Sequence, residues 1–275
     1  MEMLTPATVH ALLAEHGIRP KKSLGQHFLV DPNTARRIAA LAEVDAGEHV
    51  VEIGPGLGSL TLALVERGAR VRAVELDPAL ARVVAGIAGA DVRVADALTV
   101  DLDDLLGDEA EWACVSNLPY NVAVPVVVRL LEDAPAVERI VVLVQREVAE
   151  RLAATPGGRE YGAVSVKVAY YADATLLGVV PATVFVPRPK VESALVALVR
   201  RASPPVSVPS EAALFDLVRS GFAQRRKMLR SSLRPVLGDR AVEVLQAAGV
   251  APTARAEALG LDEWAAVARG AAAAA

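Results

Sequence analysis

Short apolar runs alternate with segments of helical periodicity through the first half of the chain. The helical segments lie near Leu57–Arg67, Pro78–Ile87, Leu102–Leu106 and Val122–Leu131. The apolar runs around them are rich in β-branched residues, as in strands that are buried on both faces. They occupy His49–Gly54, Arg70–Leu76, Val92–Asp96, Ala113–Leu118 and Arg139–Gln145. This alternating order predicts an α/β fold with a parallel, doubly wound sheet and right-handed crossovers.

The second half of the chain has a different pattern. Two β-rich stretches, Ala169–Val180 and Ser193–Arg201, are expected to add an antiparallel pair at one edge of the sheet. A proline-rich break, Ser203–Pro209, then marks a domain boundary. Helical periodicity follows at Glu211–Ala223, Arg226–Arg234, Ala241–Ala248 and Leu261–Ala268. We therefore predict a large α/β domain over residues 1–202, with residues 1–30 as an N-terminal extension, and a small all-α domain over residues 203–275.

The composition excludes several classes of protein. The 275-residue chain is 53% hydrophobic but has no run of 18 or more uncharged apolar residues, so no membrane span is expected. Glu2 and Glu15 stand where a signal peptide is apolar, which predicts a cytoplasmic protein. Cys114 is the single cysteine, so no internal disulfide can form. The four histidines have no metal-ligand spacing, and no metal is expected.

A glycine-rich loop follows the first predicted strand and opens the first helix. It reads Glu52-Ile53-Gly54-Pro55-Gly56-Leu57-Gly58, and its glycines allow a tight turn and the close approach of a ligand. Open α/β sheets bind ligands at the carboxyl ends of their strands. The next two strands end in Glu75 and Asp96, which can accept the hydroxyls of a ribose and the amine of an adenine. A loop that only packs a helix on a strand would not need these two acids.

Two classes of cofactor fit this loop. A dinucleotide-binding fold has the spacing G-x-G-x-x-G and places a pyrophosphate at the helix N-terminus. Here the spacing is G-x-G-x-G, and Glu52 precedes it on the strand. A negative charge at Glu52 suits a sulfonium or ammonium group better than a pyrophosphate. The loop therefore favours S-adenosylmethionine over NAD, which predicts a Rossmann-like, S-adenosylmethionine-dependent methyltransferase sheet.

The residues Asn117-Leu118-Pro119-Tyr120 end the fourth predicted strand and combine an amide, a rigid turn and an aromatic ring. Asn and Pro favour turns, so a plain strand-ending turn is one interpretation. The other is a pocket for a flat base that bears an exocyclic amine. The Asn117 side-chain oxygen and the Leu118 carbonyl can accept the two amine hydrogens, and Tyr120 can stack on the ring. Beside a methyl donor, this set predicts methyl transfer to the amine of a base.

Basic residues are concentrated after the proline-rich break. The net charge of −4 argues against a uniformly basic nucleic-acid binder, but residues 219–240 hold seven Lys or Arg and one Asp. Helical spacing would place five of them on one stripe, which is either a solvated face or a surface for phosphates: Arg225, Arg226, Lys227, Arg230 and Arg234. Four further cations are candidates to extend this track around the mouth of the site: Lys21, Lys22, Arg188 and Lys190.

Five motifs in this order resemble the ribosomal RNA adenine dimethyltransferase family, and the resemblance covers nearly the whole chain. They are Lys21–Leu29, the glycine loop, Asn117–Tyr120, Val184–Ser193 and Phe222–Arg230. The resemblance implies cofactor contacts at His27, Leu29, Gly54, Gly56, Glu75, Asp96 and Asn117. Many members have Asn where this chain has His27, whose protonation is expected to make cofactor binding sensitive to pH. Phe185 is implied to close the second face of the base, although an aromatic residue after a strand is otherwise typical of a core.

The resemblance is nearest to the bacterial branch of the family that modifies the small ribosomal subunit. It implies dimethylation at N6 of two adjacent adenines in a loop near the 3′ end of 16S rRNA, with S-adenosylhomocysteine as product. The expected partner is 16S rRNA within the small subunit or its precursor, and the expected state is a monomer. Three alternatives stay open: a large-subunit rRNA adenine methyltransferase, a DNA adenine methyltransferase, which usually has Asp in place of Asn117, and a non-catalytic ribosome-assembly or transcription factor.

Overall fold

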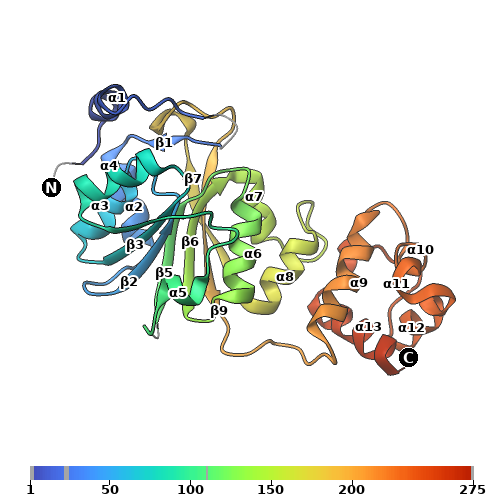
Figure 1. Ribbon diagram of the computed structural model, residues 1–275. Coiled ribbons are helices and arrows are strands. Elements are labelled where there is room, and N and C mark those ends of the chain that lie inside the picture. Colours follow the sequence, from blue (N-terminus) through green and yellow to red (C-terminus); the bar gives the residue numbers. More distant parts are fainter. Residues whose placement is uncertain (1–2, 22–24, 110, 274–275) are drawn as a thin grey trace. The chain divides into compact units, whose positions relative to one another are not determined.

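A seven-stranded sheet forms the centre of the first part of the chain (Figure 1). The computed structural model describes residues 3–21, 25–109 and 111–273. From edge to edge the strand order is β4-β3-β2-β5-β6-β9-β7. In that order the strands span Asp91–Val94, Arg70–Glu75, His49–Ile53, Trp112–Asn117, Val137–Gln145, Ser193–Arg200 and Ala172–Val180. The pairs from β4 to β6 are parallel and confirm the predicted sheet, whereas β9 runs antiparallel to β6.

The chain order reverses between β2 and β5, which pair in the middle of the sheet through Val50 and Ala113. Both strands are almost wholly buried, because their residues are apolar on both faces. A crevice opens outside the carboxyl ends of the strands at such a reversal. The sheet therefore brings the residues after Ile53 and the residues after Asn117 to one edge.

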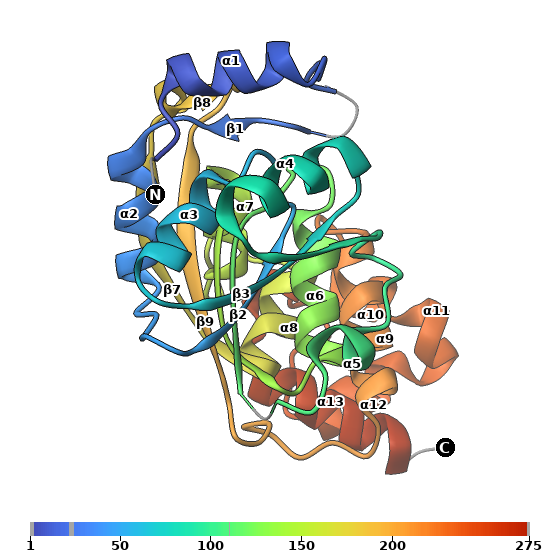
Figure 2. The same ribbon diagram turned by 60° about the vertical axis from the view of Figure 1, so that its left-hand side comes forward.

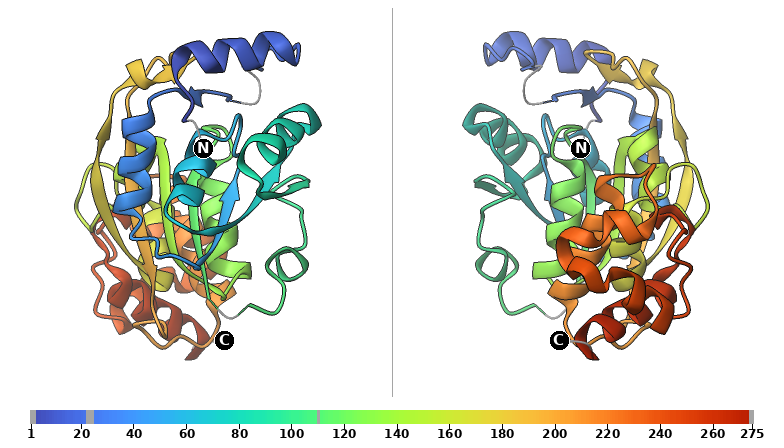
Figure 3. Two further views of the ribbon diagram at one scale, coloured as in Figure 1. Left: turned by 90° about the vertical axis from the view of Figure 1, so that its left-hand side faces the viewer. Right: turned by 90° about the vertical axis from the view of Figure 1, so that its right-hand side faces the viewer.

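Helices connect these strands and cover both faces of the sheet (Figure 3). They are α2 (Pro32–Leu41), α3 (Ser59–Glu66), α4 (Pro78–Ala88), α5 (Leu102–Leu106), α6 (Ala123–Asp133) and α7 (Arg146–Leu152), whereas α1 (Pro6–Glu15) precedes all the strands and lies beyond one end of the sheet (Figure 2). The four helices predicted in this half are confirmed to within a few residues at their ends. Aspartates cap α2, α4 and α5, because their carboxylates accept backbone N–H groups of the first turn. Among the described residues, no helix is both long and apolar enough to cross a bilayer.

A two-stranded ladder lies outside the main sheet. Its strands, β1 (Phe28–Leu29) and β8 (Phe185–Val186), come from distant parts of the chain and pair antiparallel. Figure 2 shows both of them beneath α1, at the end of the sheet where β2 and β5 stop. The ladder therefore brings the segment around His27 to the carboxyl ends of the strands.

The predicted β-rich stretch Ala169–Val180 is wrong at its start, because Ala163–Tyr171 form helix α8 and β7 begins at Ala172. The rings of Tyr170 and Tyr171 pack on Phe215, with centroids 5.4 and 6.1 Å away. These aromatic residues belong to a core that the local sequence does not reveal. The rest of the stretch lies beside β9, at the edge where strands were expected.

Contacts divide the chain into two compact units. The first comprises residues 1–149 and 174–200, and the second comprises residues 150–173 and 201–275. The second unit is helical and holds α8 together with α9 (Glu211–Ala223), α10 (Leu229–Ser232), α11 (Arg234–Leu237), α12 (Ala241–Ala247) and α13 (Leu261–Ala273). Its core surrounds the fully buried Trp264. The predicted boundary left residues 150–173 in the first domain, whereas the contacts group them with the helical unit.

The predicted helix Arg226–Arg234 is not continuous. Helix α9 ends at Ala223, and α10 begins only at Leu229. The N–H groups of Leu229 and Arg230 donate to the carbonyls of Ala254 and Pro252, at 2.8 and 3.1 Å. These bonds turn the backbone away from helical pairing. The five basic residues therefore do not lie on one helix, and this part of the prediction is wrong.

Candidate active site

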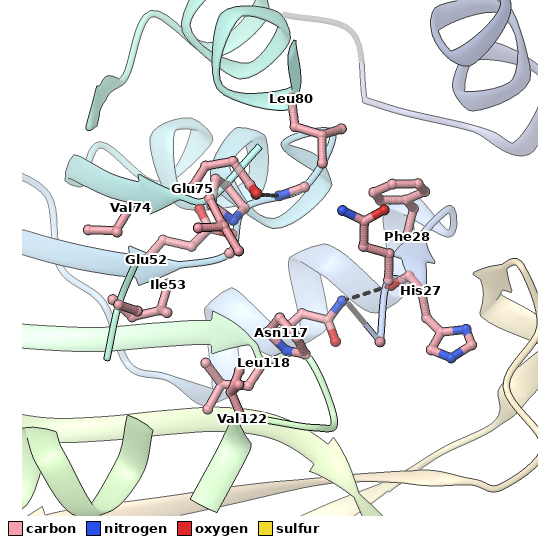
Figure 4. Close-up of a pocket in the computed structure, with 18 of the residues that line it drawn as sticks. His27, Phe28, Glu52, Ile53, Val74, Glu75, Leu80, Asn117, Leu118 and Val122 are labelled. Atoms are coloured by element: carbon pink, nitrogen blue, oxygen red, sulfur yellow. Dashed lines mark hydrogen bonds between the residues drawn. The ribbon is translucent and has the colours of Figure 1, made fainter. Parts of the chain in front are cut away.

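A cavity of about 300 Å³ opens at the carboxyl ends of β2, β3 and β5. Three segments form most of its wall: residues 25–29, the glycine loop, and residues 117–122. Glu75 and residues 95–98 complete it. Figure 4 shows Glu75 and Asn117 at the cavity on separate elements, with the backbone of His27 beside Asn117. The volume is at the lower end of the range for small-molecule sites.

Glycines allow these segments to touch one another. A Cβ on Gly54 would lie 3.3 Å from the Pro119 ring, and a Cβ on Gly56 would lie 3.0 Å from the Phe28 ring. Both glycines have positive φ, at 68° and 62°, which other residues adopt only with strain. The loop is therefore a backbone cradle, as its sequence predicts, and side chains here would fill the space for a ligand.

Glu75 is held at the centre of the cavity wall. One carboxylate oxygen accepts from the Gly56 N–H at 3.1 Å and the other from the Asp77 N–H at 3.0 Å. The side chain is buried, and burial raises the pKa of Glu75 above its usual value. Each oxygen keeps a second lone pair for ligand hydroxyls. The exposed Asp96 also lines the cavity, and its Oδ1 accepts from the Leu98 N–H at 2.9 Å.

Asn117 is oriented by the N-terminal segment. Its Nδ2 donates to the carbonyl of His27 at 3.2 Å, drawn as a dashed line in Figure 4. This bond uses one of the two amide hydrogens and orients the side chain, and no hydrogen bond from the described residues occupies Oδ1. The structure therefore brings together the side-chain oxygen of Asn117, the carbonyl of Leu118 and the ring of Tyr120 at one end of the cavity.

The rings of His27 and Tyr120 lie side by side, with centroids 5.2 Å apart. His27 Nδ1 is 2.7 Å from the Pro187 carbonyl, so Nδ1 must carry a hydrogen and donate it. The Tyr120 hydroxyl lies 2.6 Å from Ser193 Oγ, and burial raises the pKa of Tyr120. The bonds to Pro187 and Ser193 thus anchor both rings to one segment of the chain. Both residues line the cavity.

Phe185 does not reach the cavity in this structure. It pairs with Leu29 in the β1–β8 ladder, and 2% of its surface is exposed within the main core. Leu29 itself lines the cavity although it is almost fully buried. Phe185 is therefore a core aromatic residue in this structure, and its side chain would have to move in order to stack on a base.

Other wall residues escaped the sequence analysis. Phe28, Leu76, Leu98 and Val122 all line the cavity. Leu76 is 51% exposed directly after Glu75, and such an exposed leucine at a strand end is the signal that could have identified it. The others are ordinary apolar residues whose sequence neighbourhood gives no such signal.

Glu52 lies beneath the glycine loop and does not present the negative charge that was expected. It is 1% exposed, and its Oε2 accepts from the Thr61 hydroxyl at 2.7 Å. Burial raises the pKa of Glu52 from 4.5 to about 8, so the carboxyl is mostly neutral at pH 7. Burial therefore favours the protonated form of Glu52, in contrast to the negative charge expected there.

This raised pKa predicts a pH dependence of stability. The unfolded chain ionises Glu52 near pH 4.5, whereas the folded chain keeps its proton until about pH 8. The stability that protonated Glu52 contributes is therefore full below pH 4.5. It is lost progressively as the pH rises from 4.5 to about 8. We expect Glu52→Gln to reduce the loss of unfolding free energy between pH 5 and pH 7 by about 2 kcal/mol. Urea unfolding of both proteins across this range measures the difference, and parallel pH profiles would contradict it.

The basic residues of the helical unit differ in their surroundings. One Arg225 nitrogen donates to the carbonyls of Arg159 and Tyr161, at 3.0 and 2.9 Å, and lies 3.8 Å from Glu257. Arg234 pairs with an acid, Asp239, at 2.8 Å. Two of the five basic residues of the predicted stripe are therefore held by other groups of the protein. Three exposed cations have no side-chain partner among the described residues: Arg226, Lys227 and Arg230.

The cations of the first unit also differ. Lys21 forms an ion pair of 2.7 Å with Asp77, which lowers the pKa of Asp77. Arg188 and Lys190 are exposed, and Lys22 lies outside the described residues. Within the described parts of the chain, no three His, Cys, Asp or Glu side chains are placed to hold a metal ion.

Comparison with known proteins gives a consistent set of relatives. Residues 17–272 match the family model described as ribosomal RNA adenine dimethylase. The chain is 49% identical to ribosomal RNA small subunit methyltransferase A of Thermobifida fusca over 277 aligned positions, covering 97% of this chain and 95% of the relative.

Two solved structures are similar over 88% of this chain. One is a dimethyladenosine transferase from Plasmodium falciparum, with a TM-score of 0.75, 22% identity and 96% of its own chain covered. The other is the 23S rRNA methyltransferase ErmE, with a TM-score of 0.66, 29% identity and 98% of its own chain covered. The first likeness supports the fold alone, and both are consistent with the sheet and helical region described above.

Proposed function

Because the chain belongs to the ribosomal RNA adenine dimethylase family, we propose that it dimethylates N6 of two adjacent adenines in 16S rRNA. The methyl donor is S-adenosylmethionine, and the target is a loop near the 3′ end of the RNA. The observation that carries this proposal is the Asn117 amide, which the His27 carbonyl holds with its oxygen available at the cavity. The helical unit binds RNA, and the substrate is the small subunit or its precursor.

The cavity residues fit the donor by their chemistry. Glu75 accepts the ribose hydroxyls, Asp96 accepts the adenine amine, and the backbone around Gly54 and Gly56 meets the methionine part. Leu29 and His27 close the same wall. S-adenosylmethionine supplies an electrophilic methyl group on a positively charged sulfur.

The residues after β5 position the target amine. The lone pair of adenine N6 is delocalised into the ring, so the amine is a poor nucleophile, and catalysis depends on its placement. Asn117 Oδ1 and the Leu118 carbonyl accept its two hydrogens, which favours a geometry in which the nitrogen lone pair points at the methyl group. Neither group is a conventional general base, and the proton leaves to water after transfer.

Tyr120 provides a stacking surface for the target base. Its ring is held from one side by His27 and at its hydroxyl by Ser193. Stacking on an aromatic ring is worth about 1–3 kcal/mol per base, which offsets part of the cost of unstacking the target. For the second methylation, one of the two acceptors loses its hydrogen partner, and stacking has to hold the monomethylated base in place.

The exposed cations Arg226, Lys227 and Arg230 form the phosphate-binding part of the helical unit in this proposal, with Lys190 near the mouth of the site. Log affinity for RNA falls as log salt concentration rises, and the steepness of this fall grows with the number of phosphate contacts. We expect replacement of Arg226, Lys227 and Arg230 together by alanine to make the slope less steep by about 2. The matched control is Arg225→Ala, because Arg225 holds two backbone carbonyls and should affect thermal stability instead. Filter binding to small subunits at several KCl concentrations measures the slope, and an unchanged slope would contradict the assignment.

One experiment separates the proposed function from its alternatives. The protein is incubated with labelled S-adenosylmethionine and small subunits, large subunits or DNA, and the modified base is then mapped. Label in dimethyladenine of 16S rRNA supports the proposal. Label in 23S rRNA or DNA identifies the rival enzymes, and no label despite cofactor binding identifies a non-catalytic assembly factor. We further propose that the enzyme acts as a cytoplasmic monomer, which light scattering and cell fractionation test.

A further inference from the structure

The loop after β4 carries two residues of the cavity wall although it leaves the sheet. Asp96 and Leu98 line the cavity, but β4 is an edge strand that ends at Val94. Within the loop, the N–H of Val100 donates to the Asp96 carbonyl at 2.8 Å and closes a tight turn. A loop on an edge strand lacks neighbouring strands on both sides to fix it. The N–H of Ala95 donates to the Glu75 carbonyl at 3.1 Å and ties the start of the loop to β3, whereas the residues after Asp96 lie beyond the sheet and need support from another element.

Arg129 on α6 contacts this loop directly. Its Nη1 donates to the carbonyl of Ala97 at 2.6 Å, and its Nη2 donates to the carbonyl of Val100. The guanidinium is largely buried, with 20% of the side chain exposed, and its Nε lies 3.6 Å from Asp133. A planar guanidinium that binds two carbonyls fixes their orientation as well as their position.

The same helix starts at the other end of the cavity. Val122, directly before α6, lines the cavity, and its N–H donates to the Pro119 carbonyl at 3.1 Å. Arg129 follows Val122 by two helical turns and so projects from nearly the same side of the helix. A single rigid helix therefore connects the Asn117–Tyr120 segment to the loop that carries Asp96.

From this geometry we propose that Arg129 is a positioning residue for the adenine end of the cofactor. It holds the carbonyls of Ala97 and Val100, in the loop directly after Asp96, and thereby fixes Asp96 where the cofactor amine arrives. The proposal rests on the proposed function, because it takes S-adenosylmethionine as the ligand of this cavity. Arg129 acts through the loop, so its loss should affect cofactor binding more than the methyl-transfer step.

The first test compares cofactor affinity with turnover. Arg129→Met keeps a long side chain but removes both donors, and we expect the Kd of S-adenosylhomocysteine to rise about tenfold. We expect kcat at saturating cofactor and substrate to change less than about twofold. Arg129→Lys keeps one donor group and should recover part of the affinity. Arg67→Met is the matched control, because Arg67 donates to the Val44 carbonyl, away from the cavity, and should leave Kd unchanged.

The second test asks whether the effect is specific to the adenine amine. S-inosylhomocysteine carries an oxygen in place of that amine, so the wild type should bind it about tenfold more weakly than S-adenosylhomocysteine. In Arg129→Met we expect this preference to fall to about threefold or less, whereas a general loss of stability would weaken both ligands equally.

Calorimetric titration of both ligands gives the two outcomes. A fall in the preference together with a raised Kd supports the positioning role. An unchanged Kd, or a raised Kd with an unchanged preference, would overturn it. A wild-type protein that binds neither ligand would instead overturn the proposed function, so the two failures can be told apart.

Discussion

Replacing Asn117 by alanine is expected to lower methyl transfer about 10²–10³-fold while changing the Kd of S-adenosylmethionine less than about fivefold. In the proposed mechanism the Asn117 oxygen acts on the target amine, whereas Glu75 and Asp96 hold most of the cofactor. In this variant the His27 carbonyl loses the donor that lies 3.2 Å away in the wild type. His27 directly precedes β1, whose pairing with β8 should keep it in position. The site should therefore keep its shape and lose one acceptor.

Single-turnover methylation of small subunits and calorimetric binding of S-adenosylhomocysteine measure the two effects separately. Asn117→Asp is an informative companion, because it keeps an acceptor oxygen but places a carboxylate against the His27 carbonyl. We expect it to be impaired as well, since the donor that orients the side chain is gone. Transfer at near the wild-type rate by Asn117→Ala would refute the role of this residue.

Replacing Arg200 by alanine is expected to lower the free energy of unfolding by about 3 kcal/mol. Arg200 at the end of β9 donates to four carbonyls at 2.8–3.0 Å, those of Leu130, Leu131, Ala134 and Val137. The carbonyls of Leu130 and Ala134 also accept from the N–H groups of Ala134 and Val137, at 3.2 and 3.0 Å, whereas the residue four after Leu131 is a proline without an N–H. Removing the guanidinium takes one donor from each of the four carbonyls, at about 1–3 kcal/mol for each one that neither the backbone nor water then satisfies.

Arg200→Lys separates charge from geometry. An ammonium group keeps the charge but cannot reach four carbonyls at once, so we expect it to recover less than about half of the lost stability. Urea unfolding at pH 7 measures both variants. A loss below about 1 kcal/mol in Arg200→Ala would show that water or neighbouring groups replace the guanidinium.

The sheet and much of the cavity could be predicted because both depend on local sequence. Strands that are buried on both faces have a distinct composition, and parallel strands bring their carboxyl ends to one edge. Glu75 and Asn117 end β3 and β5, and Asp96 follows the edge strand β4 by two residues, so their convergence follows from the topology. The prediction of a methyltransferase rested on these residues, on the glycine spacing and on the acid Glu52 before the loop.

Features that depend on distant partners could not be predicted. The charge state of Glu52 follows from burial and from Thr61, and the fixed position of Arg225 follows from carbonyls more than 60 residues earlier in the chain. The discontinuous basic stripe likewise depends on the carbonyls of Pro252 and Ala254. No periodicity in a single sequence indicates such pairs, because they arise only when the chain has folded.

The place of β9 between β6 and β7 has a consequence for the order in which the molecule can be made. During synthesis, β6 emerges more than 50 residues before Arg200, and its outer edge stays unpaired until β9 arrives. β7 has no place in the sheet before then, because β9 is its neighbour. An unpaired edge on a strand as apolar as Val137–Gln145 attracts other strands. The nascent chain is therefore most exposed to misassembly while residues 150–200 are being added, and chains that end before Arg200 should aggregate.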